Sequence, residues 1–429
     1  MGAPETTTGG HHSHGDPAEL APLAGYRRSV LARVEPLEPI ELRLLEAHGS
    51  VLAEDIVAPG PVPGFDNSAM DGYAVQADDA DAGAALQIVG EVAAGTGDLP
   101  RVGPGQAVRI MTGAPLPPGA DAVVPVEDTE ERDGRVHLRA GATRSAHIRS
   151  AGEDVAAGDQ ILATGRRLGS ADVGMLAAVG RSLVRVHPRP RVAVISTGDE
   201  LVEPGAPLGP GQIRDTNSYT LTALAREAGA TAFRQAIVAD DERALVEAFD
   251  GALTHADLLV TSGGVSAGRY DLVKKVLADL GDVAFTKVGM RPGMPQAFGF
   301  LQGQAHQGPP IPCFGLPGNP VSAYVSFEIF VRPAIRLMQG RTDLNRQRVR
   351  AVMETAVRSA PHKVEFVRVQ LRDSPTGWTA RPTGEQGSGI LRSLVDADGL
   401  AEIAEDCTDV AAGDPVVVHV LVEHPGGSR

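Results

Sequence analysis

Apolar positions between residues 191 and 340 alternate between short buried runs and helical spacing. RVAVIST, from Arg191, is typical of a buried strand, and leucine and alanine then recur at helical spacing over residues 221–228. TAFRQAIV and DLLVTS predict further strands, and helical segments follow each of them. Strands near VAFTKV, QAFGF and IPCFGL and a helix over about 320–339 complete the segment. This order predicts an α/β domain with a mostly parallel sheet.

The flanking segments have different patterns. Over residues 18–57, leucine, valine and isoleucine recur at spacings that suggest amphipathic helices. From about 59 to 180, short apolar runs alternate with GTG, GPG, PPG and ERDG turns, which is typical of a β-rich region. Beyond about 341, VEFVRVQL, GWTARP and DPVVVHVLV alternate like strands of a small antiparallel domain. The predicted fold class is therefore α/β plus β, in several domains.

Composition narrows the class of protein. The 429 residues are 42% hydrophobic and 22% charged, as in folded globular chains, and their net charge is −15 without a local block of lysine or arginine. Such a field disfavours a nucleic-acid partner. The sequence shows no apolar run of about 18–20 residues and no basic and apolar signal at its start, so we expect a cytoplasmic protein with no membrane partner. Cys313 and Cys407 form no CxxC motif, which disfavours disulfides and thiolate zinc sites.

The first 17 residues contain almost no apolar side chain and are expected to be disordered. His11, His12 and His14 lie in this stretch. They are not expected to form a functional metal site, because a flexible tail has no surrounding groups to orient them.

Three polar, glycine-containing segments follow predicted strands of the α/β domain. STGDELVEPG follows the first strand, TSGGVSAGRYD spans residues 261–271, and GLPGNPVS precedes the last helix, which Asn319 could cap and Pro320 could open. Each segment alone could be an ordinary turn, and Asp271 could simply cap a helix. Three of them at successive strand ends indicate an anion site built from backbone N–H groups and helix dipoles.

The chemistry of that site is narrowed by its charged residues. Neither GxxxxGK[ST] nor GxGxxG is present, so a P-loop and a dinucleotide fingerprint are not supported. Glu200, Asp215 and Asp271 fall at predicted loop positions, and carboxylates beside phosphate loops commonly hold Mg²⁺. The residues alone predict a Mg²⁺-dependent phosphate-ester site.

A separate segment, PGFDNSAMDGYA, mixes turn-forming residues with Phe65, Met70 and Tyr73. This is an unusual composition for a surface loop. A catalytic role and a simple turn both remain open from the residues alone.

Seven ordered segments together resemble the bacterial molybdopterin molybdenumtransferases and the related carboxyl-terminal domain of gephyrin. They are PGFDNSAMDGYA, MTGAPLPPGADAVVPVED, RSAGEDV, STGDEL, GQIRDTNS, TSGGVSAGRYD and LPGNPVSAYVSF, and the resemblance covers about residues 20–425. It implies an extended domain I (18–57 and 141–190), an inserted β domain II (58–140), an α/β domain III that binds molybdopterin (191–340) and a β-barrel domain IV (341–425), after the tail of residues 1–17.

The resemblance also implies a reaction and its partners. Molybdate would be inserted into adenylylated molybdopterin with Mg²⁺-dependent release of AMP, which gives molybdenum cofactor. The enzyme would be a homodimer in which domain II of one chain closes the site of the other. Its partners would be small-molecule substrates, with transient contact to the molybdopterin adenylyltransferase.

Site residues follow from the same motifs. Glu200 and Asp271 would bind Mg²⁺, and Asp66 would be an essential carboxylate from the neighbouring domain. The other catalytic candidates are Asp215, Arg291 and Arg368. The substrate-binding candidates are Thr197, Gly198, Asn217, Ser262, Gly263, Gly264, Ser266, Pro317, Gly318, Asn319 and Ser388. Asp154 is a weaker candidate that a turn explains equally well.

The sequence departs from the family at two positions. RPGMP replaces the KPGKP of many members, so Arg291 keeps a positive charge whereas Met294 cannot bind molybdate electrostatically. Lys363 stands where relatives carry an arginine. Two alternatives stay open, a Mg²⁺-dependent nucleotide or pterin phosphate hydrolase and a noncatalytic scaffold. The large amino-terminal portion argues against the hydrolase, and the intact carboxylates argue against the scaffold.

Overall fold

The computed structural model describes residues 20–95, 97–263, 271–303 and 308–422. The tail predicted for residues 1–17 lies outside these ranges. Contacts divide the chain into two units, one formed by Pro39–Val186 and the other by the residues before and after that segment. Within the described ranges, no helix is long and apolar enough to cross a membrane.

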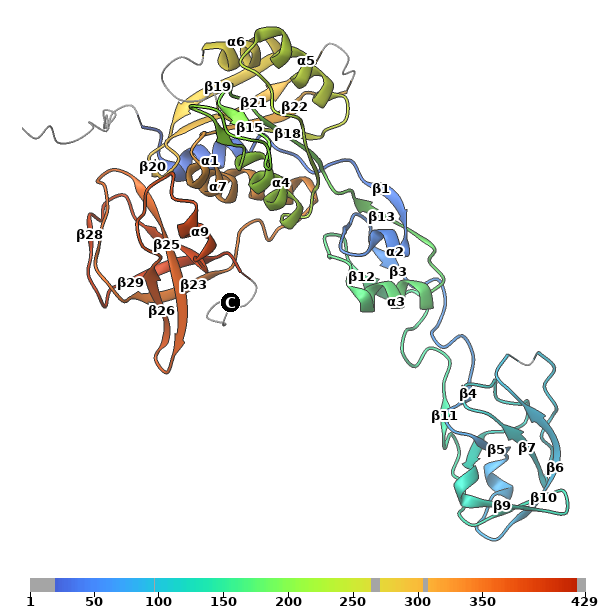
Figure 1. Ribbon diagram of the computed structural model, residues 1–429. Helices are drawn as coiled ribbons and strands as arrows, with labels where there is room; N and C mark the ends of the chain where they lie inside the picture. The colour runs from blue at the N-terminus through green and yellow to red at the C-terminus, as the bar shows by residue number, and fades with distance from the viewer. Residues whose placement is uncertain (1–19, 96, 264–270, 304–307, 423–429) are drawn as a thin grey trace, which may run out of the picture. The chain divides into compact units, whose positions relative to one another are not determined.

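A six-stranded sheet in the larger unit confirms the predicted α/β fold (Figure 1). The strand order is β17 (Thr231–Arg234), β14 (Arg191–Ser196), β18 (Leu258–Ser262), β22 (Ile311–Leu316), β21 (Pro295–Leu301) and β19 (Gly281–Lys287). The first four strands are parallel, whereas β21 and β19 complete the sheet with antiparallel pairings. The carboxyl ends of the parallel strands therefore share one edge, where open α/β sheets bind ligands.

Helices cover both faces of this sheet (Figure 1). Along β14, Val192 and Val194 enter one core, and Ala193 and Ile195 enter the other, as the two-residue period of a strand requires. The first core includes residues of α1 (Leu23–Leu31) and α4 (Asn217–Glu227), and the second includes residues of α5 (Glu242–Leu253) and α6 (Asp271–Leu280). The sheet is thus held in place from both sides.

The helix expected over about 320–339 is present. It consists of α7 (Pro320–Ser326), a π-helical turn η4 (Phe327–Val331) and α8 (Arg332–Met338). Pro320 occupies its first turn, as expected from the fixed backbone angle of proline.

The helical prediction for residues 18–57 is correct only for its first part. After α1 the chain forms β1 (Ile40–Arg43), the single turn α2 (Leu44–Ala47), β2 (Val51–Leu52) and β3 (Ile56–Val57). β1 pairs with β13 (Leu183–His187), which comes from a distant part of the chain. Pairing with a remote strand overrides the local helical spacing.

The carboxyl-terminal region forms the expected barrel. Its strands are β23 (Arg348–Met353), β25 (Val364–Ser374), β26 (Gly377–Pro382), β27 (Gly399–Ile403) and β29 (Pro415–Val420). The order β25, β26, β23, β29, β27 closes because β27 also pairs with β25. β20 (Met290–Arg291) adds to β25, and α9 (Arg392–Val395), β24 (Val357–Arg358) and β28 (Asp409–Val410) complete the region.

The smaller unit is rich in strands, as predicted. One sheet has the order β8 (Ala122–Pro125), β5 (Gly72–Val75), β7 (Gln106–Ile110), β6 (Ala85–Val92), β10 (Arg135–Leu138) and β9 (Thr129–Arg132). Shorter pairs join β4 (Asn67–Ser68) to β11 (Ile148–Arg149) and β3 to β12 (Gln160–Leu162), and α3 (Ser170–Ala178) packs in a separate core with Leu52. The division into four domains stays a prediction.

Candidate active site

The three polar segments predicted at strand ends begin side by side. Ser196 at the end of β14 pairs with Ser262 at the end of β18, which pairs with Leu316 at the end of β22. Beyond the strands, Gly263 N donates to Leu316 O at 3.1 Å and Thr197 N donates to Ser262 O at 3.4 Å. The sheet therefore gathers the three loops at one edge.

Asn217 ties these loops to one another. It is the first residue of α4, and its Nδ2 donates to Ser262 Oγ and to Gly318 O, each at 2.7 Å. A Cβ added to Gly318 would lie 3.8 Å from Gly263 Cα, so the second and third loops are in contact. The amide of Asn217 thus fixes the distance between two of the predicted substrate-binding segments.

Thr197 and Gly263 form a tight junction between the first two loops. Gly263 has φ +99, and a Cβ there would lie 3.1 Å from Thr197 O, so both the backbone angle and the space favour glycine. The Thr197 side chain is buried, and its Oγ1 has no hydrogen-bond partner in the described part of the chain. A buried hydroxyl that stays unpaired is destabilising by about 1–3 kcal/mol, so Thr197 Oγ1, at this edge of the sheet, is a candidate donor to a ligand.

Asp215 is fully engaged by the chain itself. Its carboxylate is 2% exposed and accepts hydrogen bonds from Ser196 Oγ, Ser218 N and Ser218 Oγ at 3.1, 3.0 and 2.5 Å. Arg234 Nη2 lies 4.0 Å away. These contacts connect the end of β14 to the first turn of α4. The catalytic role predicted for Asp215 stays a prediction, and its contacts are those of a positioning residue.

Negative charge is concentrated beside the first loop. Glu200 is half-buried after Gly198, and Asp199 Oδ1 accepts from Asp240 N at 3.0 Å. Burial raises the pKa of Asp240, and the charges of Asp199 and Glu200 raise it further. Sequence reasoning missed Asp240. This residue lies in the loop between β17 and α5, so its place after a predicted strand could have marked it as a candidate.

Two of the residues predicted in the second loop belong to a part that the structure does not describe. Gly264 and Ser266 lie outside the described ranges, and Asp271 opens α6 without a described side chain. Among the side chains that are described, no three histidine, cysteine or acidic residues are arranged to hold a metal ion.

Ser388, from the barrel region, is hydrogen-bonded to the third loop and to the start of α7. Asn319 Nδ2 donates to Ser388 Oγ at 3.0 Å, and Val321 N donates to Ser388 O at 3.1 Å. Asn319 occupies the expected N-cap position, but its side chain makes no capping bond, because it is directed to Ser388. The predicted residues Asn319 and Ser388, 69 positions apart, are therefore brought together.

Arg368 supports the loop that carries Ser388. The side chain is buried, with Nε donating to Ser393 Oγ at 3.0 Å and Nη2 donating to Glu385 O and Gly387 O at 3.3 and 3.1 Å. Burial lowers the pKa of Arg368 to about 10. Its predicted contact with molybdate stays a prediction, and its described contacts hold the loop backbone.

Arg291 is the more accessible of the two predicted arginines. Its side chain is 53% exposed, and its Nη1 lies 3.6 Å from Oε2 of the buried Glu365. The two residues face each other in register, Arg291 on β20 and Glu365 on β25. Met294 is half-buried nearby in sequence. Glu365 was missed by sequence reasoning, although it lies within the VEFVRVQL segment that carries Arg368.

Asp66 belongs to the smaller unit. Its exposed carboxylate accepts from Ala151 N at 2.8 Å, and Phe65 beside it is 51% exposed. Asp154 is exposed as well. How Asp66 relates to the strand-end loops stays a prediction.

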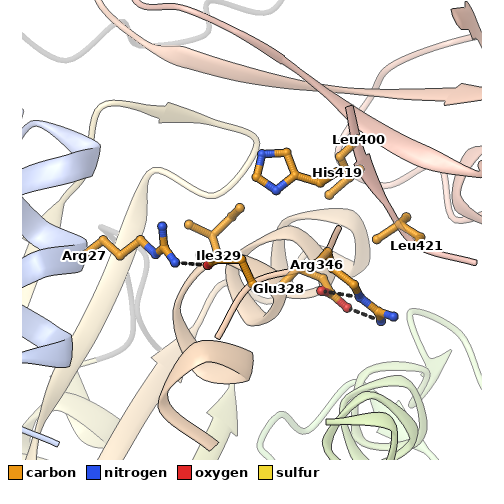
Figure 2. Close-up of a pocket in the computed structure, with 8 residues that line it drawn as sticks. Arg27, Glu328, Ile329, Arg346, Leu400, His419 and Leu421 are labelled. Atoms are coloured by element: carbon orange, nitrogen blue, oxygen red, sulfur yellow. Dashed lines mark hydrogen bonds and ion pairs between the residues drawn. The ribbon is translucent and has the colours of Figure 1, made fainter. Parts of the chain in front are cut away.

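A small cavity of the larger unit is lined by none of the strand-end residues (Figure 2). Its volume is about 10 Å³, which suits a single water molecule, and Glu328 in its wall accepts from Arg346 Nε and Nη2 at 3.0 and 2.8 Å. It is too small for an organic substrate. A larger cavity, of about 450 Å³, is lined by residues that include Leu20, Gly289 and His362 and by none of the strand-end residues. Hydrogen bonding at the strand ends therefore identifies the candidate site.

Comparison with known proteins matches the whole described architecture. Residues 21–180 match the MoeA N-terminal region (domain I and II), 193–337 a probable molybdopterin binding domain, and 350–421 the MoeA C-terminal region (domain IV). A molybdopterin molybdenumtransferase 2 of Mycobacterium tuberculosis is 44% identical over 92% of this chain and 98% of its own. A molybdopterin molybdenumtransferase of Haemophilus influenzae is 37% identical over 89% and 94%. The crystal structure of a molybdopterin biosynthesis MoeA protein from Pyrococcus horikoshii, 33% identical, superposes with a TM-score of 0.78 over 94% of this chain and 99% of that one.

Proposed function

This chain belongs to the molybdopterin molybdenumtransferase family, an enzyme family of molybdenum cofactor biosynthesis, and we propose that it inserts molybdate into adenylylated molybdopterin with Mg²⁺-dependent release of AMP. One observation carries the proposal. Asn217 joins the loops that follow β18 and β22, Thr197 and Gly263 bring the loop after β14 against the loop after β18, and the buried Thr197 hydroxyl has no partner among the described residues. A phosphate or pterin oxygen of the substrate would supply that partner.

In this proposal some residues contact the substrate and others hold the loops in position. Thr197 Oγ1 would donate to the substrate, while Asn217 keeps the second and third loops at a fixed spacing. The amino terminus of α4 adds the positive end of its dipole at the same edge. The other proposed contacts are Gly198, Ser262, Gly263, Gly264, Ser266, Pro317, Gly318, Asn319 and Ser388.

The acidic residues after β14 fit a magnesium ion. Mg²⁺ takes one or two carboxylates together with water and substrate phosphate oxygens. Glu200 and Asp271 would hold it. Burial, together with the negative charges of Asp199 and Glu200, raises the pKa of Asp240, and a divalent cation would relieve the repulsion among these carboxylates. When bound, the ion would neutralise the adenylate phosphate.

The molybdate side of the site would use fixed positive charge. Arg291 offers an accessible guanidinium, held by the buried carboxylate of Glu365, and this fork suits a tetrahedral oxyanion. Arg368, which donates to Gly387 O, would keep the adjacent Ser388 in position. Asp66 of a second copy would orient or deprotonate the attacking water or molybdate oxygen.

We infer the assembly and location from the family. A homodimer would supply Asp66 to each site, and the substrate would arrive by transient contact with the molybdopterin adenylyltransferase. A cytoplasmic location agrees with the two free cysteines, Cys313 and Cys407.

Reconstitution tests the proposal. Purified protein is incubated with adenylyl-molybdopterin, molybdate and MgCl₂, AMP is measured by chromatography, and cofactor is measured by activation of a molybdenum-dependent apoenzyme. Both products are expected to form, and chelation of Mg²⁺ should stop both. Absence of AMP and cofactor under these conditions would contradict the proposal.

Two carboxylate variants test the metal assignment. Glu200→Gln and Asp271→Asn each remove a charge and keep the side-chain shape, so each should abolish AMP release without loss of fold. Asp279→Asn is the matched control, because Asp279 is an exposed carboxylate on the same helix α6. Wild-type rates in both test variants would exclude these residues as metal ligands.

A further inference from the structure

Tyr219 is an exposed aromatic residue at the edge of the strand-end cluster. It is 45% exposed and lies in the first turn of α4, two residues after Asn217, or about 3 Å further along the helix axis. Side chains on a helix lean toward its amino terminus. Residues two apart on a helix project to nearly opposite sides, so the ring does not share the side of α4 on which Asn217 contacts Ser262 and Gly318, and it lies instead beside Glu203 of the first loop.

The ring is held in one orientation by its neighbours. Tyr219 Oη donates to Glu203 Oε2 at 3.0 Å, and this bond raises the pKa of the phenol, which keeps it a donor. The Arg234 guanidinium covers one face of the ring at 4.3 Å from its centroid. Arg234 is itself fixed, because its Nε donates to Ser218 Oγ at 3.0 Å and it forms an ion pair with Glu203.

The hydrogen bonds that hold Arg234 continue to the strand ends of the candidate site. Ser218 Oγ donates to Asp215, which also accepts from Ser196 at the end of β14. In a separate two-stranded sheet, β15 (Leu201–Val202) pairs with β16 (Ile213–Arg214). Ile213 N donates to Glu200 O at 2.8 Å, and Ile213 is 55% exposed. Exposed apolar surface thus borders both the proposed metal ligand and the strand-end loops.

We propose that Tyr219, backed by Arg234, is a stacking platform for a planar nitrogen heterocycle of the substrate. This inference rests on the proposed function, whose substrate carries two such rings, adenine and pterin. An aromatic ring with one face against a cation and its orientation fixed in advance loses little entropy when a second ring stacks on it. Stacking of a nucleobase on an aromatic side chain corresponds to roughly a 5- to 150-fold change in affinity on replacement by alanine.

Calorimetric titration separates the two rings. Wild type, Tyr219→Ala, Tyr219→Phe and the control Leu208→Ala are titrated with AMP in one arm and with 6-hydroxymethylpterin in the other. Leu208 is similarly exposed, at 47%, lies in the loop between residues 202 and 213, and carries no ring. Tyr219→Ala should raise the Kd for one probe at least tenfold, Tyr219→Phe less than threefold, and Leu208→Ala not at all. The probe that is affected identifies the stacked ring.

Turnover provides a second readout. Stacking predicts that Tyr219→Ala raises KM for adenylyl-molybdopterin and leaves kcat within about twofold. Tyr219→Leu, which keeps the bulk of the side chain, replaces the alanine variant if the latter does not fold, with the same expectation. An unchanged KM and unchanged Kd for both probes, in a wild-type enzyme that turns over, would overturn the stacking proposal alone. A wild-type protein that releases no AMP would remove the proposed function and this inference with it.

Discussion

Replacement of Asp215 by alanine tests whether this carboxylate supports the fold or acts on substrate. The residue is 2% exposed, and its carboxylate accepts three hydrogen bonds, one from Ser196 of β14 and two from Ser218 of α4. Loss of the carboxylate leaves Ser218 N, a fixed backbone donor, without its acceptor. The two serine hydroxyls can rotate toward other acceptors, so their loss is partly recovered.

The expected loss of stability follows from these contacts. A hydrogen bond to a charged acceptor contributes about 1.5–3 kcal/mol, but removal of a buried charge also relieves its desolvation. We therefore expect Asp215→Ala to destabilise the larger unit by about 3–5 kcal/mol, which is less than the sum of three bonds. Asp215→Asn keeps an oxygen acceptor for Ser218 N and should be destabilising by about 1–2 kcal/mol.

Scanning calorimetry and hydrogen exchange measure the two consequences. The transition that includes the α/β core should shift down by roughly 6–20 °C in Asp215→Ala. Amides in the first turn of α4 should exchange faster than in wild type. Asp199→Ala is the control, because its carboxylate is exposed and accepts from one backbone amide, Asp240 N. A transition within about 2 °C of wild type, together with abolished AMP release, would refute the structural role and favour direct contact with substrate.

Three further predictions concern the assembly, the oxyanion site and acid stability. Asp66→Asn should be inactive alone and regain activity in mixed dimers with Asp271→Asn, since half of the pockets then contain both native residues; failure of complementation, with subunit exchange verified, would place both carboxylates in one chain. Met294→Lys should lower the molybdate concentration for half-saturation by roughly tenfold or more, because a partly desolvated charge contact contributes about 1–3 kcal/mol; an unchanged midpoint in AMP-release titrations would exclude Met294 from the oxyanion site. Hydrogen bonds from Arg341, with the charge of Arg336, lower the pKa of Asp343 to about 2, so its stabilising effect is present above about pH 4 and lost as the pH falls toward 2. Urea midpoints at pH 5 and pH 2.5 should differ less in Asp343→Asn than in wild type, and an equal difference would show that this ion pair does not contribute.

Local patterns in the sequence were sufficient to predict the alternating strands and helices, the barrel strands and the three polar loops. The runs RVAVIST and DLLVTS became β14 and β18, and Pro320 opens the expected helix. Such features depend on side-chain periodicity and backbone preferences within a few residues, and this information is contained in the local sequence. Seven motifs in order were enough to indicate the family as well.

Tertiary structure alone decided which residues meet and which are buried. Asn217 bonds to residues 45 and 101 positions away, and β1 became a strand because it pairs with β13. The sequence presented Arg368 as a candidate ligand for molybdate, which stays a prediction, and only the fold shows that its guanidinium is buried against loop carbonyls. Contacts between distant segments are set by how whole layers pack, and no local pattern encodes the distance between two loops. That is why the candidate chemistry could be read along the chain while its geometry required the folded protein.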